Sequence, residues 1–517
     1  MAKRVCMGNE AIALGAARAG VSVVSGYPGT PSTEIIETLL NEKIPEIQVQ
    51  WSTNEKTAME VAAGAAYTGA RSMVTMKQVG LNVAADPLMS LSYVGIEGGM
   101  VVVVADDPGP WSSQTEQDTR HFAKFANLPV FDPSSPEEAY QMVSSAFDLS
   151  EEFKLPVFLR PTTRVCHASA TVDLENDPGP GPAEGFEKKP DWIIFPALSY
   201  RKHGELEQKQ KLMSDKLSTL PFNRIIEGGR KGIAVSGISY LYAMEVIKEF
   251  DLDLTVFKVG TPYPLPLRLA EEFLTSVDQV MVVEELDPVL EEQLLLVSAG
   301  KNEIFGKMTG DMPYNGEYSF ESIKNTLLKF AGVESTDLVM IDIPKLPVRP
   351  PVLCAGCPHR ASFYAAKTAA KNFEKTVYCG DIGCYTLGNA APLNTVDTCL
   401  CMGAGITIAQ GIKLAENGAK CIAFIGDSTF FHTGIPGVIN AVYQNTDITI
   451  AVLDNHTTAM TGGQPHPGTG RTAMGMPAKP LDIEKILRAC GLEHISTVDP
   501  FKYEDTVDAF RSAMEHS

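Results

Sequence analysis

The amino-acid sequence predicts an α/β protein with three doubly wound domains, each built on a mostly parallel sheet. Short apolar segments alternate with helical patterns along the chain, which is typical of βα units. Two stretches interrupt this alternation, and we interpret them as linkers: residues 172–190, which are rich in Pro, Gly and charge, and residues 341–352, which are rich in Pro. A chain of 517 residues is also too long for one hydrophobic core, because a domain averages about 150 residues.

We expect the three domains at residues 1–180, 190–340 and 345–517. Each contains apolar segments of strand length next to a helical pattern such as SYLYAMEVIKEF. The predicted strands are VSVVSG, SMVTMK, MVVVVA and LPVFLRP in the first domain, KGIAVSG, DLTVFKVG and QVMVVEEL in the second, and TVYCGDIG, CIAFIGD and ITIAVLDN in the third.

The end of the sequence predicts a third domain without its last strand. LEHISTVDP is expected to form a strand and a turn, and the residues after it a helix. A crossover helix in a parallel sheet normally leads to another strand, and none follows this one.

Composition and charge restrict the kinds of partner. The formal net charge of -20 argues against nucleic acid and anionic membranes, because both are bound by clustered Lys and Arg. Apolar runs such as GMVVVVA are far shorter than the roughly 20 residues of a membrane span, and no signal-peptide pattern follows MAKRVCMGNE. Ten cysteines in so long a chain indicate reduced thiols or metal ligands. We therefore expect a cytoplasmic protein.

Two predicted strands of the third domain end in oxygen-bearing side chains. The first is followed by Gly426 and Asp427, and the second by Asp454 and Asn455. A right-handed βαβ crossover brings both strand ends to the carboxyl edge of the sheet, where α/β proteins bind ligands. A carboxylate and an amide oxygen suit Mg²⁺, and Gly426 allows the backbone to approach a phosphate closely. The alternative is an ordinary βα turn with polar residues.

This segment resembles the diphosphate motif of thiamin-diphosphate enzymes. The motif is Gly-Asp-x followed by Asn, and here 25 residues separate Ser428 from Asp454. The resemblance implies that Asp427 and Asn455 ligate Mg²⁺ together with the carbonyl oxygen of Thr457. Ser428 occupies a position where the family usually has Gly.

The same family implies a glutamate on another domain that hydrogen-bonds the cofactor's aminopyrimidine. In STNEKTAMEVAAGAAYTG the spacing of Glu55, Ala58 and Gly64 resembles the family's glutamate segment. Glu60 shares the predicted helix and is the competing candidate. The alternative for Glu55 is an exposed helical glutamate, since most glutamates are exposed.

Further segments narrow the resemblance to the 2-oxoacid:ferredoxin oxidoreductases. SGYPGTPSTEI resembles their substrate loop, which makes Tyr27 and Thr30 candidate substrate ligands. The chain as a whole resembles the α subunits of indolepyruvate:ferredoxin oxidoreductases through the segments MKQVGLNVAADPLM, VVEELDP, LCAGCPHR, GDIGCYTLG, DTCLCMGAG and GDSTFFHTGIPGVINAV. The resemblance implies two thiamin-diphosphate-binding folds, a pyrimidine-binding one at residues 1–180 and a diphosphate-binding one at 345–517. A transketolase C-terminal-like domain is implied at 190–340.

The implied reaction is the oxidative decarboxylation of an aryl 2-oxo acid to an acyl-coenzyme A and CO₂. Two electrons pass singly to iron–sulfur centres and then to ferredoxin. The implied partners are a smaller β subunit in a hetero-oligomer, ferredoxin, the aryl 2-oxo acid and coenzyme A.

Several more residues are candidates for this site. Backbone donors for the diphosphate are expected at Gly380, Asp381, Ile382 and Gly383. Met402 either packs beneath the cofactor rings or fills the core. His432 either transfers protons near neutral pH or is a structural or solvent-facing histidine. Lys77, which ends a predicted strand, is a candidate for attracting the substrate carboxylate.

Three cysteines resemble ligands of a [4Fe-4S] cluster. Cys354 and Cys357 form a CxxC pair, and with Cys384 they resemble three of the four ligands of the cluster nearest thiamin in this group of enzymes. The fourth ligand of that group lies on a late strand. The family's C-terminal ferredoxin-like domain, with its clustered cysteines, has no counterpart in this sequence. The alternative is that all three are packed, reduced cysteines. We assign no function to Cys399 and Cys401.

Two other functions use the same cofactor residues. A non-oxidative thiamin-diphosphate decarboxylase or carboligase needs the glutamate and the Mg²⁺ site but no iron. A catalytically silent scaffold subunit binds the cofactor without turnover.

Overall fold

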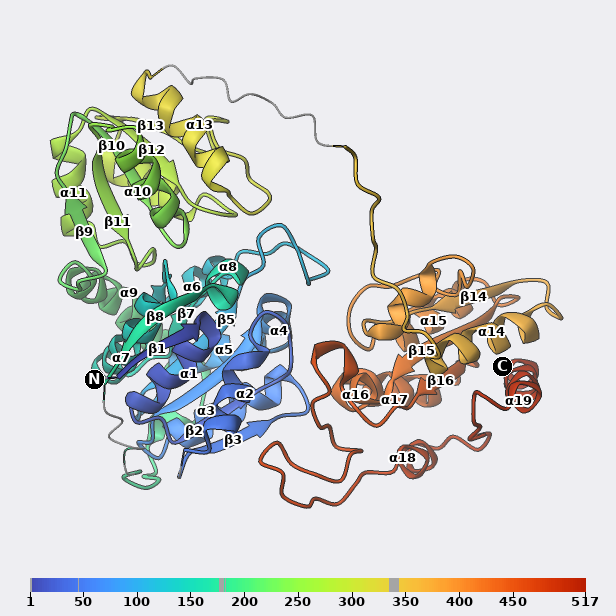
Figure 1. Cartoon of the computed structure of the whole chain (residues 1–517). Helices are drawn as coiled ribbons and strands as arrows, with labels where there is room; N and C mark the ends of the chain where they lie inside the picture. Colours follow the sequence, from blue (N-terminus) through green and yellow to red (C-terminus); the bar gives the residue numbers. More distant parts are fainter. Residues whose placement is uncertain (1, 45, 176–180, 182, 334–343) are drawn as a thin grey trace. The chain divides into compact units, whose positions relative to one another are not determined.

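A computed structural model describes residues 2–44, 46–175, 181, 183–333 and 344–517 (Figure 1). The chain divides into two compact units, Met1–Met340 and Ile341–Ser517, and each is described by itself. Both units are α/β, and their main sheets are mostly parallel, which confirms the predicted fold class. Among the described residues, no helix has the length and apolar character that crossing a membrane requires.

The first unit begins with a fully parallel six-stranded sheet in the order β3-β2-β4-β5-β7-β6. Its strands are β2 (Val23–Gly26), β3 (Gln48–Trp51), β4 (Ser72–Lys77), β5 (Met100–Ala105), β6 (Val130–Phe131) and β7 (Val157–Leu159). The accompanying helices are α1 (Gly8–Arg18), α2 (Thr33–Glu42), α3 (Glu55–Ala66), α4 (Gln78–Val83), α5 (Ala85–Val94), α6 (Arg120–Ala126), α7 (Pro136–Phe153) and α8 (Thr163–His167). Every residue of β5 is buried, as expected for a central strand covered on both faces.

A small antiparallel sheet joins the two ends of this segment. It pairs β1 (Ala2–Met7) with β8 (Ser169–Leu174). Strand β1 was not predicted from the sequence, and β8 runs into the first predicted linker. The rest of that linker is partly outside the described residues, and residues 183–189 have no helix or strand.

The first unit also contains a five-stranded sheet in the order β13-β12-β10-β11-β9. It is parallel except for β9, which pairs antiparallel with β11. The strands are β9 (Asn223–Ile226), β10 (Lys231–Val235), β11 (Thr255–Val259), β12 (Gln279–Val283) and β13 (Glu303–Phe305). The helices are η1 (Pro190–Trp192), α9 (Pro196–Leu217), α10 (Ser239–Glu249), α11 (Leu267–Ser276), α12 (Val289–Ser298) and α13 (Phe320–Ala331). Alternate residues of β10 enter different cores, Ile233 on one face and Ala234 on the other.

The second unit has a parallel sheet of three described strands in the order β14-β15-β16. The strands are β14 (Thr376–Cys379), β15 (Lys420–Gly426) and β16 (Thr449–Leu453). The helices are α14 (Pro358–Ala370), η2 (Cys384–Asn389), α15 (Ala404–Ala415), α16 (Asp427–Thr429), the π-helix η3 (Phe430–Gly434), α17 (Ile435–Tyr443), η4 (Ala459–Thr461), α18 (Ile483–Ala489) and α19 (Tyr503–His516).

The strand predicted in LEHISTVDP is wrong, whereas the helix predicted after it is present as α19. Leu492 and Ile495 do pack against the core, as the apolar pattern suggested. The described structure has no strand at residues 492–499, so the apolar pattern there reflects packing and not pairing in a sheet. Part of the second predicted linker lies outside the described residues, and residues 344–352 carry no regular structure.

Candidate functional site

The two strand ends singled out in the sequence lie side by side in the second unit. Gly426, the last residue of β15, pairs with Leu453, the last residue of β16. The carboxylate of Asp427 is only 3% exposed, and it accepts the Ser428 N–H at 2.8 Å. The side-chain oxygen of Asn455 accepts the Thr457 N–H at 3.2 Å. The parallel βαβ arrangement therefore brings Asp427 and Asn455 to one edge of the sheet.

A histidine that was not predicted from the sequence contacts Asp427. His466 Nε2 lies 3.0 Å from Asp427 Oδ2, and both side chains are buried. The Thr458 hydroxyl donates to the Ser428 hydroxyl at 2.9 Å, so the segment after β16 folds back over the start of α16. The available signal was a proline-flanked histidine, QPHPG, shortly after the second strand end.

Two carboxylates crowd together at this edge. Burial alone would raise the pKa of Asp427, but the hydrogen bond and charge of His466 outweigh it and lower that pKa. Burial raises the pKa of Asp454, and the nearby carboxylate of Asp427 raises it further. Such a pair favours a cation between or beside its members.

Asp381 ties together the turn that was expected to supply backbone donors. Its fully buried carboxylate accepts the N–H groups of Ile382 and Gly403 at 2.7 Å each, and the Tyr385 hydroxyl at 3.1 Å. Burial raises the pKa of Asp381 to about 7. The N–H of Gly380 donates to the Thr398 carbonyl at 2.7 Å. The turn is thus held from within the unit.

The other two glycines of the expected diphosphate site lie close to an aromatic ring. A Cβ at Gly426 would lie 2.6 Å from the Tyr385 ring, and one at Gly383 would lie 2.4 Å from it. The N–H of Gly383 donates to the Thr386 hydroxyl at 3.1 Å. Both positions therefore require glycine in order to accommodate Tyr385.

His432 and Met402 lie near this turn. His432 is 3% exposed on the π-helix η3, so it does not face solvent. Its charge acts on the carboxyl of Asp381, whose pKa it lowers against the larger effect of burial. The Thr433 hydroxyl donates to the Met402 carbonyl at 2.9 Å, which connects η3 to the loop before α15.

The three candidate cluster cysteines come from two neighbouring segments. Cys357 precedes α14 directly, and its N–H donates to the Cys354 carbonyl at 3.2 Å. Burial raises the pKa of the Cys384 thiol, and the nearby thiols of Cys357 and Cys354 raise it further. Within the described ranges, no group of three or more His, Cys, Asp or Glu side chains is arranged to hold a metal ion.

Glu55 lies at the carboxyl edge of the six-stranded sheet in the first unit. It is the first residue of α3, which Asn54 caps by accepting the Thr57 N–H at 2.8 Å. Its side chain is 5% exposed, whereas Glu60 is exposed and paired with Lys56. The exposed-glutamate alternative thus holds for Glu60 and not for Glu55. A Cβ at Gly80 would lie 2.6 Å from Glu55 Oε1, so the backbone of α4 packs against this carboxylate.

The predicted substrate residues gather at the same edge. Lys77 ends β4, and its Nζ donates to the Ser112 carbonyl at 3.1 Å. The Ser112 hydroxyl donates to the Thr30 carbonyl at 3.2 Å. Burial lowers the pKa of Lys77, while the nearby carboxylates of Asp107 and Glu55 oppose that effect. Tyr27 follows β2 directly and is buried.

Two domain families match the chain. Residues 14–184 match the family described as "Pyruvate flavodoxin/ferredoxin oxidoreductase, thiamine diP-bdg". Residues 381–517 match "Thiamine pyrophosphate enzyme, C-terminal TPP binding domain". The two matches contain Glu55 and Asp427, respectively.

Six relatives that match nearly the whole chain carry one name. The chain is 44% identical over 530 residues to "Indolepyruvate oxidoreductase subunit IorA" of Archaeoglobus fulgidus, covering 99% of this chain and 84% of that protein. It is 42% identical to the protein of the same name from Methanothermobacter thermautotrophicus, covering 99% and 85%. A solved 2-oxoglutarate:ferredoxin oxidoreductase from Magnetococcus marinus has a similar fold, with a TM-score of 0.51 and 17% identity over 64% of this chain and 65% of that one.

Proposed function

The chain belongs to the family of indolepyruvate oxidoreductase IorA subunits, and from this we propose the function of its site. It is a thiamin-diphosphate-dependent oxidoreductase subunit that decarboxylates aryl 2-oxo acids of the indolepyruvate type oxidatively. The products are CO₂ and an acyl-coenzyme A, and the electrons pass to ferredoxin. The observation that carries the proposal is 44% identity over 99% of the chain, together with thiamin-binding family matches at both ends.

The donor set of the second unit fits a Mg²⁺-bound diphosphate. Asp427, Asn455 and the Thr457 carbonyl offer one carboxylate and two neutral oxygens, which is a set that Mg²⁺ accepts. The adjacent carboxyl of Asp454 adds negative charge that a divalent cation offsets.

We assign the neighbouring Gly426 and Ser428 to the diphosphate side, and Met402 to the cofactor rings. The turn at residues 380–383 lies on the same side through Tyr385, which packs against Gly383 and Gly426. Its Gly380, Ile382 and Gly383 N–H groups donate within the unit, so the turn shapes this side and does not supply those three donors. When bound, thiamin diphosphate supplies a thiazolium, which acts as an electron sink for decarboxylation.

The first unit supplies the acid–base and substrate residues in this proposal. Glu55 would hydrogen-bond the cofactor's aminopyrimidine from a buried position at the start of α3. Lys77 and Thr30 bind the substrate carboxylate, and Tyr27, which is buried directly after β2, is a further substrate residue. Two observations support this assignment: the residues lie at one edge of the sheet, and Ser112 joins Lys77 to Thr30 through hydrogen bonds. His432 of the second unit moves a proton during turnover.

We also propose one [4Fe-4S] cluster on Cys354, Cys357 and Cys384. The Cys357 N–H donates to the Cys354 carbonyl, and both thiols are near enough to Cys384 to raise its pKa, which supports the proposal. Thiolates are the usual ligands of such clusters, and a fourth ligand is required. Cys399 and Cys401 are exposed near the Asp381 turn and have no assigned role.

The relatives' names describe subunits, so this chain works in a multi-subunit oxidoreductase. We propose a smaller β subunit and ferredoxin as its protein partners. A cytoplasmic location fits the cysteines, which are free in the described residues.

The test is anaerobic purification of the chain with its partner subunit, followed by iron and acid-labile sulfide analysis. Indolepyruvate, coenzyme A and a low-potential viologen dye are then added. We expect iron and substrate-dependent dye reduction. Iron-free protein that releases CO₂ without reducing the dye would instead indicate a non-oxidative decarboxylase, and cofactor binding without turnover would indicate a scaffold.

A further inference from the structure

A single loop connects the substrate residues to the five-stranded sheet. This loop, residues 107–119, runs from the end of β5 to the start of α6. At the centre of the loop, the Ser112 carbonyl accepts a hydrogen bond from the Lys77 ammonium, and the Ser112 hydroxyl donates a hydrogen bond to the Thr30 carbonyl. The Ser112 N–H in turn donates to Asp107 Oδ2 at 2.9 Å, within the same loop. The position of this loop therefore decides where the Lys77 ammonium lies.

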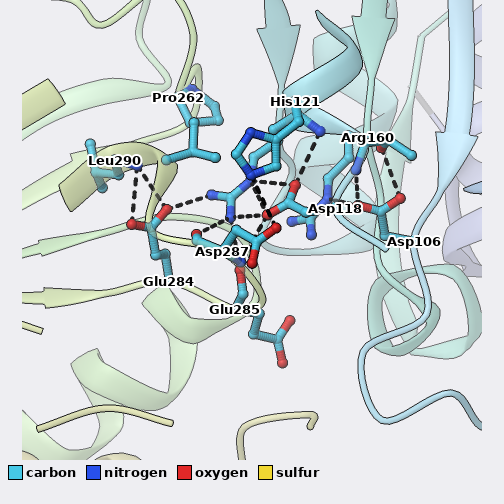
Figure 2. A network of polar contacts seen from close by, with 12 residues as sticks. Asp106, Asp118, His121, Arg160, Pro262, Glu284, Glu285, Asp287 and Leu290 are labelled. Carbon is cyan, nitrogen blue, oxygen red and sulfur yellow. Dashed lines mark hydrogen bonds and ion pairs between the residues drawn. The ribbon is translucent and has the colours of Figure 1, made fainter. Parts of the chain in front are cut away.

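The end of the loop is held by a buried ionic network that Figure 2 shows in close-up. Asp106, just before the loop, accepts the Thr119 N–H at 3.1 Å, the Thr119 hydroxyl at 2.8 Å and Arg160 Nε at 2.7 Å. Arg120, just after the loop, is fully buried and bonds Asp118 through Nε and Nη2. Both ends of the loop are thus fixed to one set of charges.

Arg120 connects this set to the five-stranded sheet. Its Nη1 donates to Glu284 Oε2 at 2.6 Å, at the residue that follows β12. Its Nη2 donates to the carbonyls of Glu285 and Asp287 at 2.8 Å each. Glu284 is held in place by the N–H groups of Leu290 and Glu291 at the start of α12.

Two further contacts brace the outer part of the loop. One carboxylate oxygen of Glu116 accepts the Gly109 N–H at 2.6 Å and the Gly316 N–H at 2.7 Å, which ties the loop to the segment before α13. The indole N–H of Trp111 donates to Glu317 Oε2 at 3.1 Å. The five-stranded sheet and its loops therefore contact loop 107–119 near both its base and its tip.

Such a network costs desolvation energy that a well-packed apolar cluster would avoid. Replacing buried ion pairs by apolar groups is often neutral or stabilising, so stability alone does not explain this arrangement. A fully paired network of this kind does fix one geometry, because each charged group is satisfied only while its partners stay in place. The feature that this geometry fixes is the loop that carries Ser112.

We propose that Arg120 is a positioning residue through which the five-stranded sheet sets the Lys77 ammonium for the substrate carboxylate. This rests on the proposed function, in which Lys77 binds that carboxylate. Arg120 does not contact the substrate itself. It holds loop 107–119, and the Ser112 carbonyl of that loop holds Lys77.

The test compares Arg120→Lys, Glu116→Ala and Lys77→Met in the complete complex. Arg120→Lys keeps the charge but loses the forked contacts to Glu284 and the two carbonyls. Glu116→Ala is the milder variant, because it removes only the brace to Gly316 and Gly109. The matched control is Lys124→Met, which breaks the exposed Lys124–Glu292 pair of 2.9 Å between α6 and α12.

We expect the two loop variants, Arg120→Lys and Glu116→Ala, to raise KM for indolepyruvate roughly tenfold, because the contact with the substrate carboxylate is weakened in the ground state. The value of kcat and the affinity for thiamin diphosphate should stay within about twofold. Hydrogen–deuterium exchange of a peptide covering residues 107–119 should quicken in both variants. Lys124→Met should change neither quantity.

Two results would overturn the inference, and they are distinguishable. If Lys77→Met raises KM but the loop variants behave like Lys124→Met, the positioning role is wrong and the role of Lys77 stands. If Lys77→Met leaves KM unchanged, the assigned role of Lys77 is wrong, and the positioning role falls with it. Absence of dye reduction in the unmodified complex would refute the proposed function itself.

Discussion

Gly80→Ala is expected to displace the Glu55 carboxylate. The new Cβ would lie 2.6 Å from Glu55 Oε1 and 2.8 Å from its Cγ, whereas ordinary contacts of this kind begin at 3.4 Å. The carboxylate must therefore move by a sizeable fraction of an ångström, and a misplacement of about 1 Å in a catalytic group can cost about a hundredfold in rate. Since Glu55 is assigned to proton handling, we expect kcat to fall by about ten- to a hundredfold. Cofactor affinity should change little, because the diphosphate residues lie in the second unit.

Gly64→Ala is the matched control on the same helix as Glu55. Nothing lies within 4 Å of a Cβ at Gly64, and a helical Gly replaced by Ala gains about 0.5–1 kcal/mol of stability. Steady-state dye reduction gives kcat and KM, isothermal titration calorimetry gives thiamin-diphosphate affinity, and urea unfolding gives stability. If Gly80→Ala turns over as fast as Gly64→Ala, the placement of Glu55 as the proton-handling group is refuted.

The other predictions concern single side chains. Glu55→Gln should leave cofactor binding intact and reduce kcat by about a hundredfold or more, and normal turnover would refute its role. Asp427→Ala should abolish Mg²⁺-dependent thiamin-diphosphate binding by calorimetry, and unchanged binding would exclude Asp427 as the ligand. His466→Asn should weaken that binding by about 10–100-fold, as loss of a ligand's hydrogen-bond partner does. Burial raises the pKa of Glu285 to about 7, so its folded form keeps a proton that the unfolded chain loses. Stability should therefore fall as pH rises from about 4.5 to 7, by about 3 kcal/mol, and urea unfolding of Glu285→Gln should lack that fall.

The sequence predicted the elements that repeat a simple pattern. The βαβ unit around Asp427 follows from two apolar runs and an intervening helix, and the structure has it as β15, α17 and β16. The central strands β5 and β10 were also predicted, because each is a short apolar run. The long helix α9 was missed because its surface is largely polar and its buried residues, such as Met213 and Leu217, are few. The strand predicted in LEHISTVDP shows the reverse case, in which apolar spacing came from packing.

Candidate site residues could be predicted from the sequence beside the ends of strands and helices, whereas contacts between distant segments could not. Asp427, Glu55 and Lys77 begin or end an element, and Asn455 follows β16 by two residues. The sequence could therefore indicate these residues as candidates. His466 was not located, because its contact with Asp427 depends on how the loop after β16 returns. The same holds for the contact between Ser112 and Lys77, which joins residues 35 positions apart. Such contacts depend on loop geometry that periodicity does not encode.

The arrangement of the two sheets in the first unit agrees with the proposal that its substrate residues come from the six-stranded sheet. Ligands usually bind at the carboxyl edge of an open parallel sheet. In the five-stranded sheet that edge is covered by the six-stranded one: the Asp132 N–H donates to the Gly260 carbonyl at 2.8 Å, and the Val130 N–H to the Tyr263 carbonyl at 2.7 Å. Glu284, at the same edge, is bound by Arg120. With that edge covered, the five-stranded sheet acts through the loop that it braces.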